Sequence, residues 1–219
     1  MARRNIPLTM TAVNYAAHIA SLFDTDISRV LKVCEESVAV EKIVSGKLRG
    51  KNLWALTYDK RKALYAITRL LRPAVAVETG VGSGVSTTFL LSALRSGMLH
   101  SIDLGVKYGE EKVEYPVGFL VPERLKKKWH LHKGDARELL KPLLNDLGDI
   151  QLFYHDSRHT YSHVNFELEC AWEHTDRGIV LVDNYEFTRA PEKFADRVGA
   201  PIVRLSSRAG GFCAIPKGF

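Results

Sequence analysis

A glycine-rich segment after an apolar, β-branched run is the clearest chemical feature of this sequence. Residues 74–77 are apolar, Glu78 follows them, and Gly80, Gly82 and Gly84 then precede a second apolar stretch. This order predicts a strand that passes through a tight turn into a helix. Glycine allows positive φ and lacks the Cβ atom that would keep a ligand away from the backbone. The first N–H groups of the helix can bind an electron-rich group, so the segment predicts a nucleotide-like cofactor.

Two kinds of cofactor suit such a turn, and an α/β protein can also carry a glycine-rich turn without any ligand. A dinucleotide-binding turn has the pattern G-x-G-x-x-G, with an acid about twenty residues further on for the ribose. Val85 stands in place of the third glycine, whereas Asp103 has the required spacing. Glu78 favours another cofactor, because a carboxylate beside the loop would repel a pyrophosphate. It suits a phosphate-free cation such as S-adenosylmethionine.

Helical and strand patterns alternate along most of the chain and must position these residues. We expect helices at 57–71, 86–95, 122–128, after 136, and at 161–174. We expect strands at 74–78, 99–103, 129–132, 150–155 and 178–182, then a closing pair at 201–205 and 211–215 with its turn at 208–210. This order predicts an α/β fold with a doubly wound, mainly parallel sheet and helices on both faces. Residues 1–55 have helical spacing and predict an N-terminal helical cap on a main domain of residues 56–219.

Acidic residues stand at the ends of the five expected parallel strands. They are Glu78, Asp103, Asp135, Asp156 and Asp183. In folds of this kind, ligands bind beyond the carboxyl ends of the strands. We therefore expect the five side chains to lie along one rim of the sheet and to form the binding site.

Five short motifs surround these acids: Glu78–Gly82, Ile102-Asp103, Gly134–Ala136, His155–Tyr161 and Val182–Asn184. With them, the chain from about Thr57 to Gly211 resembles the class I S-adenosylmethionine-dependent methyltransferases, which have a Rossmann-like fold. It looks closest to the small metal-dependent O-methyltransferases, both the catechol type and a bacterial group related to sugar O-methyltransferases. The resemblance implies that the protein methylates a hydroxyl group of a small molecule.

The resemblance also implies which residues contact the cofactor. Asp103 would accept hydrogen bonds from the ribose hydroxyls and Asp135 from the adenine amino group, since an ionised carboxylate is only an acceptor. His155 could pack under the adenine ring. The complete expected cofactor-binding set is Glu78, Gly80, Gly82, Ser83, Ser86, Asp103, Asp135, Ala136 and His155.

Three oxygen-bearing side chains follow two strands that we expect to be neighbours. Asp156 ends the strand at 150–155, and Asp183-Asn184 ends the strand at 178–182. Adjacent strands lie about 4.8 Å apart, so these oxygens can converge on a hard divalent cation such as Mg²⁺. The resemblance implies the same metal site, so we expect EDTA to abolish turnover. The alternative is that an Asp after a strand only caps a helix or forms a turn.

His159 lies three residues after Asp156 and is the expected general base. An imidazole with a pKa near ~6.5 can take a proton at neutral pH. The catechol-type enzymes carry a lysine at this relative position, and the sugar-type relatives a histidine. His155 and His163 are rival residues for the same role. Asp156 and His159 would then carry the catalysis, with the cation lowering the pKa of the substrate hydroxyl.

The charge of the chain raises a different methyl acceptor. The net charge of +6 and the pI of about 9.2 are compatible with nucleic acid as a partner. His155–Arg158 stands where amine-methylating nucleic-acid enzymes carry Asn/Asp-Pro-Pro-Tyr, and no cysteine follows a proline as C5-cytosine methylation needs. Nucleic acid is therefore disfavoured. A methyltransferase without metal, an NAD-dependent oxidoreductase and a non-catalytic cofactor-binding protein also remain compatible with the glycine-rich turn.

The composition predicts a cytoplasmic protein that does not enter a membrane. No apolar run approaches the ~20 residues of a membrane span, and no continuous apolar region of a signal peptide follows the basic residues 1–5. Cys34, Cys170 and Cys213 are odd in number and widely spaced, which is typical of reduced thiols. We also expect that the N-terminal helices could join copies of the chain into a homo-oligomer.

Overall fold

The computed structural model describes residues 10–49, 55–105, 115–206 and 210–219. Its α-helices are α1 (Met10–Leu22), α2 (Ile27–Glu36), α3 (Val38–Leu48), α4 (Tyr58–Leu71), α5 (Val85–Ala93), α6 (Ala136–Leu147), α7 (Tyr161–Glu173) and α8 (Ala190–Val198). Its strands are β1 (Val75–Thr79), β2 (Met98–Asp103), β3 (Trp129–Lys133), β4 (Leu152–His155), β5 (Gly178–Asp183), β6 (Val203–Ser206) and β7 (Phe212–Lys217). Two 3-10 helices, η1 (Glu123–Lys128) and η2 (Tyr185–Phe187), lie between them.

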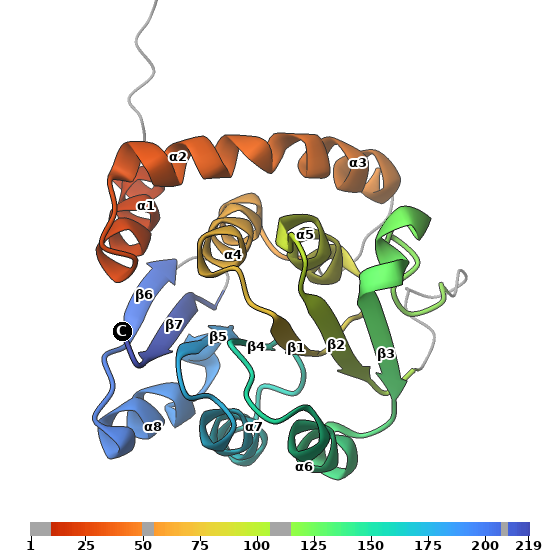
Figure 1. Cartoon of the computed structure of the whole chain (residues 1–219), viewed down its shortest axis with the longest axis vertical. Coiled ribbons are helices and arrows are strands. Elements are labelled where there is room, and N and C mark those ends of the chain that lie inside the picture. Colours follow the sequence, from red (N-terminus) through yellow and green to blue (C-terminus); the bar gives the residue numbers. More distant parts are fainter. Residues whose placement is uncertain (1–9, 50–54, 106–114, 207–209) are drawn as a thin grey trace, which may run out of the picture.

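The strands form one seven-stranded sheet in the order β3-β2-β1-β4-β5-β7-β6 (Figure 1). The first five in this order are parallel, while β7 is antiparallel to both β5 and β6. The order runs outward in both directions from β1 and β4, which is the doubly wound arrangement. The predicted α/β fold with a mainly parallel sheet and a closing pair of strands is therefore confirmed.

The register of the parallel strands brings their carboxyl ends to one edge. Thr79 at the end of β1 pairs with Ile102 of β2 on one side and with His155 of β4 on the other. His155 in turn pairs with Val182 of β5. The residues that follow these strands therefore emerge next to one another, and any site built from them is held by the sheet.

Helices cover both faces of the sheet (Figure 1). Helices α4 and α5 lie on one face with α1 beside α4 near β6 and with α2 and α3 outside them, and α6, α7 and α8 lie on the other face. Ile19 of α1, Val30 of α2 and Val44 of α3 belong to the same hydrophobic cluster as Leu64 of α4 and Phe89 of α5. The N-terminal helices thus share a core with the rest of the chain, and the division near residue 55 stays a prediction.

The structure corrects three details of the expected elements. Helix α8 was not predicted, although Pro191 in its first turn is typical of a helix start. The short helix expected at 122–128 is the 3-10 helix η1 and begins one residue later. Strand β4 begins at Leu152 instead of residue 150, because the Gln151 side chain accepts hydrogen bonds from the N–H groups of residues 74 and 75.

Some expectations remain predictions after the fold is known. Residues 1–5 and the turn residues 208 and 209 lie outside the described residues. None of the helices in the described part of the chain has the length and apolar character needed to cross a bilayer. Ile27 and Leu31 of α2 are exposed apolar residues on the N-terminal helices. Assembly through these helices and the cytoplasmic location are still expectations from the sequence.

Candidate functional site

A cavity of about 740 Å³ lies at the carboxyl edge of the parallel strands. This volume is within the ~300–1,000 Å³ that small-molecule sites usually have. The sequence-predicted residues that line it are Gly80, Gly82, Ser83, Ser86, Asp103, Asp135, Ala136, Asp156, His159, Asp183 and Asn184. The expected gathering of the strand-end acids on one rim is thus observed, with Glu78 as the exception.

The glycine-rich loop at one end of the cavity is held by Asp103. Its Oδ2 accepts hydrogen bonds from the backbone N–H groups of Val81 (2.9 Å) and Gly82 (3.1 Å). Its Oδ1 accepts a hydrogen bond from the Gly105 N–H at 2.9 Å. Because Asp103 ends β2, the neighbouring strand fixes the loop that follows β1.

Gly80 allows this loop to pack directly against the backbone that follows β4. Its φ is +84°, and a Cβ atom placed there would lie 2.0 Å from the carbonyl oxygen of Asp156. A side chain is therefore excluded by both conformation and contact. The glycine brings the loop and the Asp156 segment together into one wall.

We expect Gly80→Ala to lower the free energy of unfolding by more than the ~1–3 kcal/mol that one strained backbone position costs. Urea denaturation measures this loss. Gly46→Ala is the matched control, because Gly46 lies within α3 with nothing within 4 Å of a built Cβ. There the change should stabilise the protein by about 0.4–1 kcal/mol. Equal stability of the two variants would contradict this account of the loop.

Glu78 lies beneath the loop and not on the cavity wall. It is fully buried and accepts hydrogen bonds from the hydroxyls of Ser86 (2.6 Å), Thr87 (2.8 Å) and Ser101 (2.7 Å). Burial raises the pKa of this carboxyl group to about 7, although the three donors oppose the rise. Through its hydrogen bond with Ser86, Glu78 supports the loop from below. Direct contact between Glu78 and a cofactor stays a prediction.

The remaining expected cofactor residues differ in their placement. Asp135 caps α6 and accepts a hydrogen bond from the Arg137 N–H at 2.8 Å, so the helix N-terminus and its neighbour Ala136 face the cavity. His155 is fully buried and is not among the lining residues. Its Nδ1 lies 2.6 Å from Glu167 Oε2. The packing of His155 under an adenine ring is therefore an expectation that the structure does not test.

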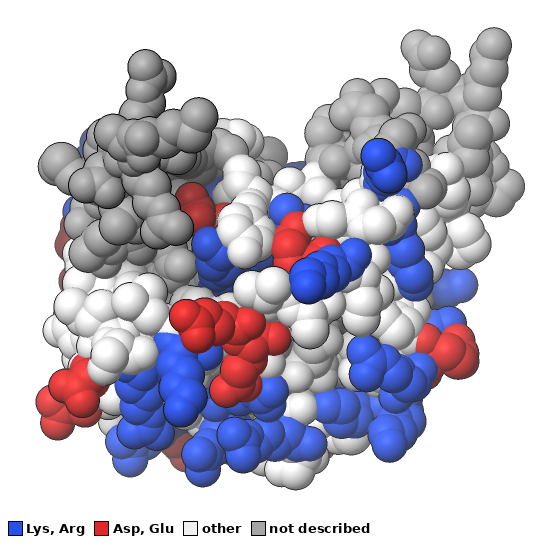
Figure 2. Space-filling view, turned by 90° about the horizontal axis from the view of Figure 1, so that it is seen from above, with Lys and Arg blue, Asp and Glu red and all other residues white. Residues whose placement is uncertain are grey.

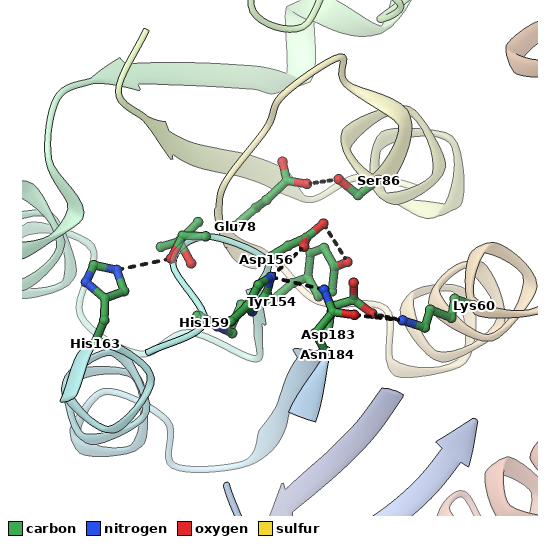
Figure 3. A network of polar contacts seen from close by, with 12 residues as sticks. Lys60, Glu78, Ser86, Tyr154, Asp156, His159, His163, Asp183 and Asn184 are labelled. Atoms are coloured by element: carbon green, nitrogen blue, oxygen red, sulfur yellow. Dashed lines mark hydrogen bonds and ion pairs between the residues drawn. The ribbon is translucent and has the colours of Figure 1, made fainter. Parts of the chain in front are cut away.

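Asp156, Asp183 and Asn184 converge in the same cavity, as the strand order predicted (Figure 3). Burial raises the pKa of both carboxyl groups, and the nearby charge of Asp183 raises that of Asp156 further. The Tyr154 hydroxyl donates a hydrogen bond to Asp156 Oδ2 at 3.1 Å. Two neighbouring carboxyl groups repel each other when both are ionised, unless one of them keeps a proton or a cation lies nearby.

That cation is supplied by Lys60, which the sequence analysis did not single out. Its Nζ donates a hydrogen bond to Asp183 Oδ1 at 2.6 Å and to Asn184 Oδ1 at 3.4 Å. The side chain is only 2% exposed. A signal was present, because Lys60, Leu64 and Ile67 have the spacing of one helix face and the other two are apolar.

The three oxygen-bearing side chains have the donor types for Mg²⁺, but an ammonium group stands between two of them. Mg²⁺ binds oxygen at about 2.0–2.1 Å, so an ion on Asp183 Oδ1 and Asn184 Oδ1 would lie beside Nζ. At 4 Å, a divalent ion and an ammonium repel by about 8 kcal/mol at an effective dielectric constant of ~20. In the described parts of the chain, no group of three or more His, Cys, Asp or Glu is placed to hold an ion. This arrangement does not fit the expected Mg²⁺ site.

His159 lines the cavity beside this cluster. The Asn184 amide donates a hydrogen bond to its Nε2 at 3.1 Å, and Asp156 Oδ1 lies 3.8 Å from the same nitrogen. Burial and the nearby His155 lower the pKa of the His159 imidazole to about 4. The ring is therefore neutral at pH 7, and its unprotonated Nε2 is the nitrogen that accepts the Asn184 N–H.

A second buried polar cluster lies behind His159 and was also missed. Glu167 of α7 accepts hydrogen bonds from Thr79 (2.6 Å) and Ser157 (2.8 Å), and it contacts His155 and His163 at 2.6 and 2.8 Å. The sequence signal was the i, i+4 spacing of His163 and Glu167 among apolar residues. The cluster ties α7 to the ends of β1 and β4.

Comparisons with known proteins agree with this geometry. Residues 77–185 match the family model of a methyltransferase domain. No curated protein matches the sequence. One similar solved structure is that of the O-methyltransferase TomG from Streptomyces achromogenes, which is involved in tomaymycin synthesis and was crystallised in complex with SAM. Its TM-score to this chain is 0.58, and the two sequences are 16% identical over 93% of this chain and 96% of TomG.

Two further solved structures have the same fold. The O-methyltransferase from Bacillus cereus in complex with SAH has a TM-score of 0.58 and 14% identity over 95% of this chain and 99% of that one. Cofactor-bound Rv0187 from MTB has a TM-score of 0.58 and 15% identity over 98% of both chains.

The sheet order, the glycine-rich loop and the strand-end acids define a class I methyltransferase fold with its binding cavity at the carboxyl edge. Residues 77–185 match the model of a methyltransferase domain, and the chain as a whole has the fold of the solved methyltransferases.

Proposed function

We propose that this protein transfers the methyl group of S-adenosylmethionine to a hydroxyl group of a small molecule. One observation carries the proposal: a single cavity is lined both by a glycine-rich loop and by a neutral histidine among oxygen-bearing side chains. The similarity to two structures described as O-methyltransferases, one with SAM and one with SAH, supports oxygen as the methyl acceptor.

The loop end of the cavity would hold the cofactor. Asp103 ends β2 beside the loop, where its carboxylate can accept hydrogen bonds from ribose hydroxyls. Asp135 follows β3 and can accept a hydrogen bond from the adenine amino group. Both side chains line the same cavity as Gly80 and Gly82, and Asp103 contacts the loop directly, so we assign the cluster at Asp156 to the acceptor.

The acceptor end would carry out the transfer with His159 as the base. The acceptor hydroxyl displaces the Asn184 amide N–H from the lone pair of His159 Nε2 and gives its proton to this nitrogen. The oxygen attacks the methyl carbon, an O–C bond forms and the C–S bond breaks. S-Adenosylhomocysteine leaves as a neutral thioether, and Asp156 at 3.8 Å stabilises the imidazolium. Much of the acceleration comes from positioning the two reactants.

Phe187 supports a small organic acceptor. Phe187 is 62% exposed, and its ring stands edge-on to the His159 ring, with centroids 5.7 Å apart. An exposed aromatic ring beside the base offers an apolar surface to an acceptor that carries a ring or a short carbon skeleton. The face in Figure 2 shows many Lys and Arg side chains with Asp and Glu side chains among them. Mixed charge of this kind does not by itself favour nucleic acid.

Mg²⁺ dependence was part of the expectation from the sequence, and the reaction proposed for this site does not need it. The ligand types support it, whereas the position of the Lys60 ammonium at Asp183 and Asn184 opposes it. The steps above therefore use only side chains of the chain itself.

The proposal is tested by cofactor binding and by methyl transfer. Calorimetry with S-adenosylmethionine and S-adenosylhomocysteine should show binding of one cofactor per chain. S-Adenosylhomocysteine release should then be measured with phenols, catechols, sugars, amines and RNA as acceptors. We expect turnover with members of the hydroxyl set. Absence of cofactor binding, or transfer only to amines or RNA, would contradict the proposal.

A further inference from the structure

The position of Lys60 is unusual for a lysine. It lies in the first turn of α4 with a side chain that is 2% exposed. Lysine is almost never fully buried unless it is paired, because removing its charge from water costs a large free energy. Figure 3 shows the side chain reaching from α4 toward Asp183 and Asn184 at the end of β5. The fold thus holds a fixed positive charge inside the cavity.

Helix packing explains how the ammonium reaches this place. Leu64 and Ile67, which share a helix face with Lys60, are fully buried in the hydrophobic cluster that covers the sheet. Lys60 stands at the N-terminal end of the same face, where the helix passes the carboxyl edge of the strands. Its apolar stem continues the buried stripe, and its Nζ meets the polar end of β5.

The negative charges near His159 are consistent with one cation at this place, the Lys60 ammonium. Asp183 contacts the ammonium directly, and Asn184 contributes its amide oxygen. Asp156 lies on the neighbouring strand end and lines the same cavity as Lys60 and His159. These are the oxygen atoms that would otherwise surround a divalent ion, so an ammonium and an ion would compete for one place.

We infer that the Lys60 ammonium takes the place of a divalent cation in this site and neutralises the charge that develops on the acceptor oxygen. The chemistry rests on the proposed methyl transfer, with the acceptor proton going to His159 and the methyl group leaving sulfur for oxygen. A fixed ammonium near the oxygen stabilises the alkoxide or phenoxide character of the transition state. Asp183 and Asn184 are positioning residues, which hold Nζ in place.

The first experiment needs no acceptor. The purified wild-type protein is titrated with Mg²⁺ and Mn²⁺ by calorimetry, its metal content is measured after dialysis, and its melting temperature is followed with each ion. We expect no stoichiometric ion and no rise in melting temperature. One bound divalent ion per chain that is lost in Asp183→Asn would overturn the inference.

The second experiment removes the ammonium. Lys60→Ala leaves the two carboxylates and the amide oxygen without their cation, so we expect this variant to gain one divalent-ion site and to melt at a higher temperature with Mg²⁺. Lys62→Ala is the matched control, since Lys62 lies on the same helix and pairs with Asp59 at 3.8 Å near the surface. Lys60→Met removes the ammonium but preserves the apolar stem, so ion binding is measured in this variant as well. A folded Lys60 variant that binds no ion would contradict the inference.

Activity separates this inference from the proposed function. With an accepted hydroxyl substrate, wild-type turnover should persist in EDTA, and Lys60→Ala should lower kcat by about 10²–10³-fold, the effect of losing one group that stabilises developing charge. Mg²⁺ should restore part of this loss in the variant and change nothing in the wild type. Loss of wild-type turnover in EDTA would overturn the role of Lys60. If no acceptor is methylated, the proposed function fails. The ion-binding results still decide whether the cation at this site is the Lys60 ammonium or a divalent ion.

Discussion

His159→Gln is expected to lower kcat by about 10²–10⁴-fold, the usual contribution of a positioned general base. Cofactor affinity should change little, because His159 lies outside the glycine-rich loop and is hydrogen-bonded to Asn184. Calorimetry with S-adenosylhomocysteine and steady-state kinetics with an accepted hydroxyl substrate measure the two effects separately.

The pH profile provides an independent check of the same assignment. The pKa of His159 is lowered to about 4 by burial and by the nearby His155. A base must be unprotonated, so kcat/KM should rise with pH through about 4 and stay level from there to neutral pH. The acid limb should be absent in the residual activity of His159→Gln. A limb at the ordinary pKa of ~6.5 would assign the base to a different or more exposed group.

His174→Gln is the control for both measurements. His174 lies at the end of α7, where its ring contacts Asn145 and the carbonyl oxygen of Cys170, and it does not line the cavity. We expect wild-type kcat and a wild-type pH profile. If the two histidine variants lose the same activity, a general effect on folding explains the loss better than removal of a base.

Glu167→Gln is expected to lower the free energy of unfolding by about 3–5 kcal/mol, the usual effect of removing one partner of a buried ionic network. The carboxylate is fully buried and is an acceptor for the donors of Thr79, Ser157, His155 and His163. Glutamine has the same shape, but its amide turns two hydrogens toward this donor-rich surrounding. Urea denaturation at pH 7 measures the loss.

Glu169→Gln on the same helix is the matched control. Its side chain is 46% exposed and pairs with Arg197 at 2.7 Å, so its loss should cost only about 0–1 kcal/mol. Comparable destabilisation by both variants would contradict the network described at Glu167.

Acid also weakens the network at Glu167. Burial by itself raises the pKa of Glu167, but the charge of His155 and the hydrogen bonds lower it more, so the net pKa is well below the ordinary 4.5. A depressed carboxyl pKa stabilises the folded state fully above the ordinary value, and this stabilisation is lost as the pH falls below it. The difference in unfolding free energy between wild type and Glu167→Gln should therefore shrink below about pH 4.5.

The general architecture could be predicted from the sequence because it depends on local patterns. β-Branched runs and helical spacing alternate along the chain, and this alternation leads to a parallel sheet with helices on both faces. Acidic residues directly follow the β-branched runs. Because parallel strands end at the same edge of a sheet, this position predicted that the acids lie along one rim of the sheet. Asp103, Asp135, Asp156 and Asp183 do line one cavity there.

Features that depend on contacts between distant segments could not be predicted in the same way. Glu78 follows the same sequence rule as the other acids, yet its side chain points beneath the loop toward the hydroxyls of Ser86, Thr87 and Ser101. Side chains alternate between the two faces of a strand. A strand-end position therefore does not by itself decide whether a side chain lines the cavity or supports it from below.

By itself, the sequence determined the class of fold, the edge of the sheet where the cavity lies and the resemblance to methyltransferases. Only the tertiary structure decided which cation stands at that edge. Lys60 and Asp183 are 123 positions apart, and a lysine on a helix gives no local sign of the carboxylate that it meets. Helix α4 must pack on the sheet before the ammonium reaches β5, because long-range packing and not local spacing creates that contact.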